Sequence, residues 1–125
     1  MILEFQKLHA KVKTPERGHP SDAGLDVFYH PSSGQEPYRM ISPGESLLFG
    51  TGLKFGVPHG YMLEVKNRSS MAAKKSLLVG ACVIDSGYDG EVFINLHNVG
   101  TTEQYISQDD KIAQLVMVPV VHFRA

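Results

Sequence analysis

The chain has 125 residues, of which 42% are hydrophobic and 20% are charged. These proportions are typical of a globular chain with one domain, residues 1–125, and exclude a disordered or fibrous one. The net charge of −1 excludes a general attraction to nucleic acid or to an anionic membrane, so an anionic ligand would need a local cluster of donors.

The cysteine content and the N-terminal sequence indicate an intracellular protein. Cys82 is the only cysteine, which excludes an internal disulfide and suits a reducing compartment. The start MILEFQKLHAKVK carries charges every few residues, unlike a signal peptide, and no apolar run is long enough to span a bilayer. We therefore expect a cytoplasmic location, or an intracellular one in a host cell if the source is viral.

Short apolar runs between turn clusters predict an all-β fold. The clusters PERGHPSDAG, HPSSGQEP, SPGE and VPHG are rich in the residues that form turns. YMLEVK alternates in polarity, which places Tyr61, Leu63 and Val65 on one face of a strand. In EVFINLHN the residues predicted to share the inner face are Val92, Ile94 and Leu96.

One helix and one long strand complete the predicted elements. SSMAAKKSLL is the only helical stretch, and Ser69 or Ser70 is its expected N-cap. DSGYDG, between the apolar runs GACVI and VFINL, predicts a hairpin turn. IAQLVMVPVVHF predicts a strand buried on both faces or against another subunit, and Pro119 marks an edge or the end of that strand. The expected architecture is a compact barrel or sandwich of many short strands.

The first candidate for chemistry is SDAGLDV, in which Asp26 follows two small residues. Ala23 and Gly24 would let a ligand or a backbone segment approach closely. The alternative is that Asp26 only caps a turn before a strand.

The second candidate is KNRSSMA, where the predicted helix begins. Backbone N–H groups at a helix start favour phosphate, and Arg68, Ser69 and Ser70 would add side-chain donors. The alternative is an ordinary serine cap beside a surface arginine.

The third candidate is the acidic turn that contains Asp85 and Asp89. Asp85 follows small and apolar residues, so it should leave the end of a buried strand at a controlled place. An aspartate is ionised at neutral pH and can orient a water molecule, which favours Asp85 as a general base. Asp89 lies within the turn, where we expect only a solvent-exposed turn residue.

The fourth candidate is Gln114 in DDKIAQLV, a polar residue within an apolar strand. Its amide must find partners or face water. A phosphate oxygen is one possible partner, and a neighbouring backbone group is the alternative.

In this order and spacing, the four stretches resemble the trimeric deoxyuridine triphosphatase (dUTPase) family. SDAGLDV is similar to its first motif, SPGESLLFGTGLKFGVPHGYMLEVKNRSS leads into the second, CVIDSGYDGEV resembles the third and DKIAQLVMVPV the fourth. The resemblance implies a distorted β-barrel or jelly-roll-like subunit and a homotrimer with active sites at subunit boundaries. It also implies hydrolysis of dUTP to dUMP and pyrophosphate with Mg²⁺ bound to the phosphates.

The resemblance also implies a role for each matching residue. Asp85 would activate the water that attacks the α-phosphorus, and Tyr88 would pack against the deoxyribose and exclude a 2′-hydroxyl. Asp26 would act on the metal through water. The implied substrate-binding residues are Arg68, Ser69, Ser70, Gly80 and Gln114, with Gly80 in a hairpin that reads uracil together with Leu78 and Val79.

Several positions depart from the family pattern. Cys82 and Asp109 stand where glycine is usual, and Asn67 stands where glycine or proline is common. The sequence stops at VVHFRA, before any counterpart of the fifth motif, a glycine-rich arm that closes over the nucleotide. Either the chain was cut short, or the site closes differently, or catalysis is weak.

Two other functions have to be weighed. A dCTP deaminase shares the scaffold but needs a glutamate as general base where this chain has Asn95, which cannot accept the proton. A dUTPase-like trimer that binds a nucleotide or a protein without turnover would explain the missing arm, but it would not require all the matching site residues.

Overall fold

Eleven short strands and one helix make up the chain in this computed structural model, which describes residues 1 to 125. The elements are β1 (Glu4–Lys7), β2 (Leu25–Phe28), β3 (Tyr38–Ile41), β4 (Ser46–Gly50), β5 (Leu53–Gly56), β6 (Tyr61–Lys66), α1 (Ser69–Lys75), β7 (Leu77–Val79), β8 (Val83–Ile84), β9 (Phe93–Asn98), β10 (Gln104–Ser107) and β11 (Lys111–Pro119). The prediction of an all-β chain with at most one short helix is confirmed. None of its helices has the length and apolar character needed to cross a membrane.

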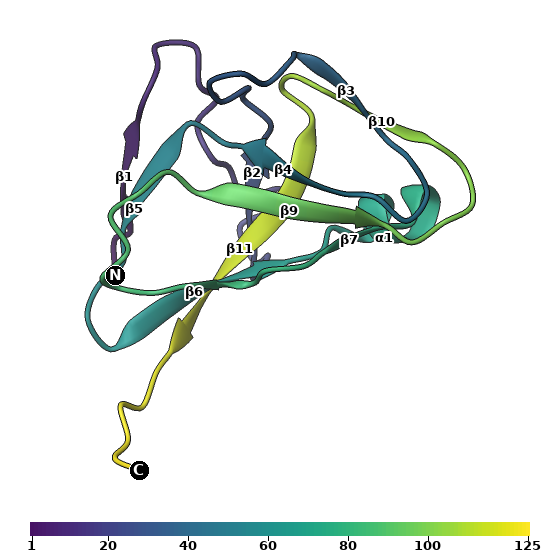
Figure 1. Ribbon diagram of the computed structural model, residues 1–125. Coiled ribbons are helices and arrows are strands. Elements are labelled where there is room, and N and C mark those ends of the chain that lie inside the picture. The colour runs from purple at the N-terminus through teal and green to yellow at the C-terminus, as the bar shows by residue number, and fades with distance from the viewer.

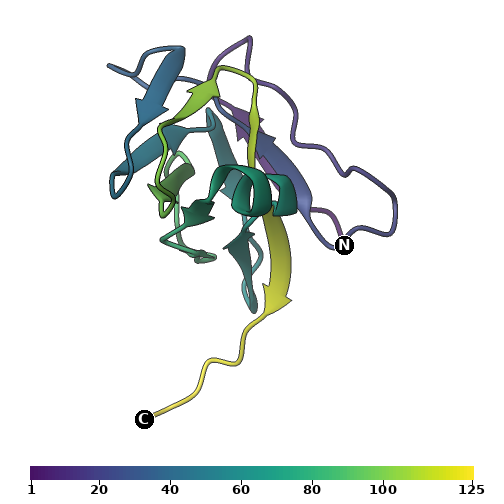
Figure 2. The ribbon, with the colours of Figure 1, turned by 90° about the vertical axis from the view of Figure 1, so that its right-hand side faces the viewer.

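The strands pair in four antiparallel sheets, which surround the interior in Figures 1 and 2. The orders are β2-β11-β6-β8, β4-β9-β7, β1-β5 and β10-β3. Separate sheets do not make a closed barrel, so of the two expected forms the chain follows the jelly-roll-like one.

Strand β11 is the central element of the largest sheet, because β2 pairs with one of its edges and β6 with the other. In Figure 1 it runs through the middle of the molecule, and the residues after it, 120–125, extend away from the body in both ribbon views. The strand ends at Pro119, as the sequence indicated, since proline has no N–H for a further ladder bond.

The alternation read from the sequence is confirmed in β6 and β9. Leu63 and Val65 of β6 are buried, and so are Ile94 and Leu96 of β9. A single cluster of 20 buried residues fills the space between the sheets. Its largest side chains with less than 2% exposure are Tyr29, Phe49, Ile41, Leu53, Leu63, Leu77, Ile94, Leu96, Ile106, Ile112, Leu115 and Val27.

The expected N-cap of the helix is wrong. Arg68 occupies the N-cap position with extended backbone angles, and no side chain caps the helix. Ser69 and Ser70 instead form its first turn, and Met71 is the residue that anchors it in the core. Packing of Met71 therefore holds a seven-residue helix whose N-terminus has no side-chain cap.

The hairpin predicted for DSGYDG is also wrong. Strand β8, which precedes the turn, pairs only with β6, whereas both edges of β9 are occupied by β4 and β7. The segment between β8 and β9 therefore passes from one sheet to another. A local turn remains, in which the N–H of Tyr88 donates to the carbonyl oxygen of Asp85 at 3.1 Å.

Asp109 adopts a backbone conformation that explains why glycine is usual at this position. Its φ is +72°, in the left-handed region, and its N–H donates to the carbonyl oxygen of Tyr29 at 2.8 Å. One oxygen of its carboxylate, Oδ1, is buried without a hydrogen-bond partner. The position therefore carries backbone strain that a glycine would relieve.

We predict that Asp109→Gly is more stable than Asp109→Ala by about 1 kcal/mol, because alanine keeps the Cβ that disfavours a positive φ. Urea denaturation of both variants measures the difference in the free energy of unfolding. Equal stability would show that the left-handed conformation costs nothing here.

Candidate active site

The register of β11 brings three predicted site residues into one place. Gln114 lies opposite Asp26 of β2 on one side and opposite Lys66, the last residue of β6, on the other. Arg68 follows β6 by two residues and so starts the helix beside the same point. Strand pairing thus joins the first, second and fourth candidate stretches, which are far apart in the sequence.

The side chain of Gln114 has a backbone partner within the chain. Its Nε2 donates to the carbonyl oxygen of Asn67 at 2.8 Å. A Cβ on Gly24 would overlap the Gln114 amide, so the close approach expected at Gly24 is made by a protein side chain. The side chain Oδ1 of Asn67 also accepts from the N–H of Val79 at 2.7 Å, so Asn67 links β6, β7 and β11.

The carboxylate of Asp26 lies between two cations. Arg68 Nε is 3.3 Å from its Oδ1 and Lys111 Nζ is 3.5 Å from its Oδ2, and the side chain is only 13% exposed. Lys111 also approaches Glu16 at 3.3 Å. Ion pairing, rather than turn capping, is therefore what holds Asp26 in place.

Sequence reasoning missed Lys111, and a β-bulge explains why. In regular alternation Lys111 and Gln114 would point to opposite faces of β11, but the register shifts between Lys111 and Ala113. Both side chains consequently line the same cavity.

That cavity has a volume of about 630 Å³ and no hydrophobic lining residue. Its residues are Gly18, His19, Asp22, Asp26, Arg68, Ser69, Lys111 and Gln114. The sequence analysis also missed His19 and Asp22, which are joined by a hydrogen bond of 2.9 Å from the His19 N–H to Asp22 Oδ2. Ser70 does not line the cavity, and its hydroxyl lies 3.4 Å from Arg68 Nη1.

The predicted general base lies elsewhere. Asp85 follows β8 directly and is exposed. The sheet order β2-β11-β6-β8 puts Asp26 and Asp85 at opposite edges of one sheet. Strands lie about 4.8 Å apart, so the three steps between these edges amount to about 14 Å.

Tyr88 lines a second, apolar cavity of about 250 Å³, which shares no residue with the polar one. Tyr88 is 47% exposed, and its hydroxyl donates to the carbonyl oxygen of Glu91 at 2.6 Å. Asp89 is exposed as expected and pairs with Lys54 at 2.8 Å. The hydrogen bond and the positive charge of Lys54 lower the pKa of Asp89.

Gly80 lies in a segment that also differs from expectation. β7 pairs with β9 and β8 pairs with β6, so no hairpin forms between β7 and β8. The N–H of Gly80 donates to the carbonyl oxygen of Asn95 at 2.9 Å, and a Cβ here would overlap the side chains of Asn95 and His97.

The side chain of Asn95 belongs to a small polar network. Its Nδ2 donates to Ser46 Oγ at 2.8 Å, and its Oδ1 lies 2.9 Å from His97 Nε2.

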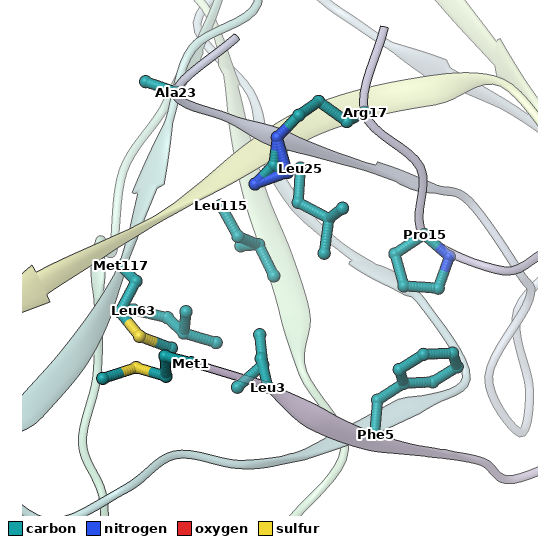
Figure 3. A pocket seen from close by; sticks show the side chains of 10 residues that line it. All are labelled: Met1, Leu3, Phe5, Pro15, Arg17, Ala23, Leu25, Leu63, Leu115 and Met117. Carbon is teal, nitrogen blue, oxygen red and sulfur yellow. The ribbon is translucent and has the colours of Figure 1, made fainter. Parts of the chain in front are cut away.

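A third cavity, of about 470 Å³, is mainly apolar and contains none of the predicted site residues (Figure 3). Leu25, Leu63 and Leu115 reach it from β2, β6 and β11. It is therefore lined by the sheet that carries Asp26, but it shares no lining residue with the polar cavity.

A metal ion would find no complete protein site in this chain. No group of three or more histidine, cysteine, aspartate or glutamate side chains is placed to hold one. The carboxylates of Asp22 and Asp26 do line the polar cavity, where a metal could be shared with a ligand.

Comparison with known proteins gives one consistent family. The sequence pattern of the dUTPase family matches residues 10–125. The deoxyuridine 5′-triphosphate nucleotidohydrolase of Gloeobacter violaceus is 39% identical over 118 residues, which cover 93% of this chain and 78% of that protein. The Aquifex aeolicus enzyme of the same name is 38% identical over 124 residues, which cover 96% of this chain and 80% of that protein.

Solved structures agree with the sequence matches. The dUTPase from phage phi11 of S. aureus has a TM-score of 0.89 and 26% identity, covering 100% of this chain and 94% of that one. A variant of the same phage dUTPase, described for its coordination of a structural Mg(II) ion, has a TM-score of 0.89 and 25% identity, covering 100% and 95%.

We predict that Gly24→Ala destabilises the fold by about 1–3 kcal/mol, because the new Cβ would displace the Gln114 amide from Asn67. Gly87→Ala is the matched control, since nothing lies within 4 Å of a Cβ there and its effect should stay within about 0.5 kcal/mol. Thermal denaturation compares the two, and equal melting temperatures would contradict the packing role of Gly24.

Proposed function

The chain belongs to the dUTPase family, and on that premise we propose that it hydrolyses dUTP to dUMP and pyrophosphate at sites shared between subunits. The polar cavity carries the proposal. Asp26, Arg68, Ser69 and Gln114 come from three separate stretches of the sequence, and all four line the same space.

The cavity would bind the triphosphate. Arg68 can donate two hydrogen bonds to phosphate oxygens, and the Ser69 hydroxyl and the Gln114 amide can each add one. Both Arg68 and Gln114 now bind protein groups, Asp26 and Asn67 respectively. A bound phosphate would therefore replace Asp26 and Asn67 as the partners of these two side chains. The hydrogen bond from Arg68 Nη1 to the Ser70 hydroxyl could remain while the phosphate is bound.

Magnesium fits this cavity only as a shared ion. Mg²⁺ keeps several waters and binds through one or two carboxylates and substrate phosphates, which suits a cavity with two carboxylates and no protein cage. When bound, the ion would neutralise charge on the phosphates. Asp26 would hold it through water, and Asp22 is the other carboxylate of the cavity.

Asp85 would be the general base. Its carboxylate would accept a proton from a water molecule as the water oxygen forms a bond to the α-phosphorus. The bond between that phosphorus and the bridging oxygen would break, and pyrophosphate would leave with the bridging oxygen. Positioning and charge neutralisation then supply most of the catalysis.

Tyr88 and Gly80 would select the nucleoside. The ring of Tyr88 would pack on the deoxyribose where a 2′-hydroxyl would collide. Gly80 lies at the crossing segment between two sheets, where its backbone would contact uracil. The N–H of Gly80 already donates to the carbonyl oxygen of Asn95, so the carbonyl oxygen of Gly80 is the backbone group that would contact uracil.

A homotrimer would join the two halves of the site. In one chain the Asp85 edge and the Asp26 edge of the sheet are about 14 Å apart, and Asp85 does not line the polar cavity of its own chain. If Asp85 of one subunit faces the polar cavity of the next, three subunits in a ring form three complete sites. The free Cys82 and a nucleotide substrate support a location inside the cell.

We predict that dUTP with Mg²⁺ yields pyrophosphate, while dCTP, dTTP and UTP yield little. Asp85→Asn should lower kcat by a factor of about 10²–10⁴, because an amide cannot accept the proton. Coupled pyrophosphate detection measures turnover, and calorimetric titration with dUMP measures binding, which should survive the substitution.

Three results would contradict this account. Ammonia released from dCTP would indicate a deaminase, although Asn95 is tied to Ser46 and His97 instead of providing a base. Tight dUTP binding without turnover would indicate a binding or regulatory trimer. Full activity of Asp85→Asn would remove Asp85 from the mechanism.

A further inference from the structure

The two-residue link between β4 and β5 holds the loop that carries Asp85 and Tyr88. The buried hydroxyl of Thr51 donates to the carbonyl oxygen of Val92 at 2.7 Å, and the N–H of Val92 donates to the carbonyl oxygen of Leu53 at 2.9 Å. The N–H of Gly52 donates to the Glu91 carboxylate at 3.2 Å. In Figure 1 the segment that leads into β9 accordingly passes beside the start of β5.

The carboxylate of Glu91 occupies a slot between two glycines. A Cβ on Gly50 would lie 2.8 Å from Glu91 Oε2, so no side chain fits there. Gly52 has φ +67°, and a Cβ there would overlap Val12, so a side chain at this position would disturb both backbone and packing. The direction of the Gly52 N–H, and with it the position of the carboxylate, is therefore fixed by the backbone.

Glu91 contacts Tyr88 through a different atom. Its backbone carbonyl oxygen accepts the hydrogen bond from the Tyr88 hydroxyl at 2.6 Å. The tyrosine ring folds over Gly90, where a Cβ would lie 2.7 Å from the hydroxyl oxygen. Glu91 thus binds Gly52 through its side chain and Tyr88 through its backbone carbonyl oxygen.

We propose that Glu91 is a positioning residue that sets the sugar selectivity of the enzyme. Its carboxylate, held by the Gly52 N–H, fixes the carbonyl that holds the Tyr88 hydroxyl and so fixes the ring. The inference rests on the proposed role of Tyr88 as the group that excludes a 2′-hydroxyl. A ring that can move leaves room for that hydroxyl, so UTP should become a better substrate while dUTP turnover changes less.

The test compares kcat/KM for dUTP and UTP in Glu91→Ala, Glu91→Gln and Lys54→Met. We expect Glu91→Ala to lower the dUTP to UTP ratio about fivefold, the effect of losing one hydrogen bond. Glu91→Gln should restore the ratio, because its amide oxygen can still accept from Gly52. Lys54→Met is the matched control, since it breaks only the exposed ion pair of Asp89 in the same loop.

A second variant tests the same contact without touching Glu91. Tyr88→Phe removes the hydroxyl and leaves the ring, and it should lower the ratio by a similar factor even if Glu91→Ala does not fold. An unchanged ratio in Tyr88→Phe would overturn the inference. An equal loss for both substrates in Glu91→Ala, together with a lower melting temperature, would also overturn it, because it would show only a structural role.

Tyr88→Ala separates this inference from the proposed function. If that variant leaves the ratio unchanged, the sugar-filter role of Tyr88 fails and the inference fails with it. If Tyr88→Ala lowers the ratio but Glu91→Ala and Tyr88→Phe do not, the proposed function stands and only the positioning role of Glu91 is overturned.

Discussion

The pairing of β11 with β2 and β6 is the constraint on which the polar cavity depends. Because Gln114 must lie opposite both Asp26 and Lys66, the residues around those positions converge on one place. The bulge after Lys111 adds a second cation to the same side, and the absence of a side chain at Gly24 leaves room for the Gln114 amide. A change of one residue in this register would turn Gln114 to the other face of the sheet.

The same sheet also separates the two groups of residues that the proposed reaction needs. Its order puts β2 and β8 at opposite edges, so the residues proposed to bind phosphate and the proposed general base lie apart within one chain. The turn after β8 is held by a different part of the fold, the link at Thr51 and Gly52. The proposed phosphate-binding and sugar-selecting residues are therefore held by separate contacts, and substitutions at one set should leave the other largely intact.

Sequence reasoning predicted the features that depend on local pattern and missed those that depend on pairing. The alternation in β6 and β9 and the end of β11 at Pro119 follow from side-chain periodicity and from the missing proline N–H. The supposed hairpin at DSGYDG failed because turn residues do not reveal which strand will pair with which. Lys111 was missed because a bulge reverses the alternation, and no single residue in the sequence marks that bulge.

Mixing two inactive variants tests most directly whether a second subunit completes the site. Arg68→Met disables the polar cavity and Asp85→Asn disables the proposed base, so each variant alone should release almost no pyrophosphate from dUTP. When equal amounts are unfolded and refolded together, a site shared between subunits should recover about a quarter of wild-type activity, because random assembly pairs an intact Arg68 with an intact Asp85 at that frequency. No recovery from mixed oligomers would show that each site is built within one chain, which would contradict the account.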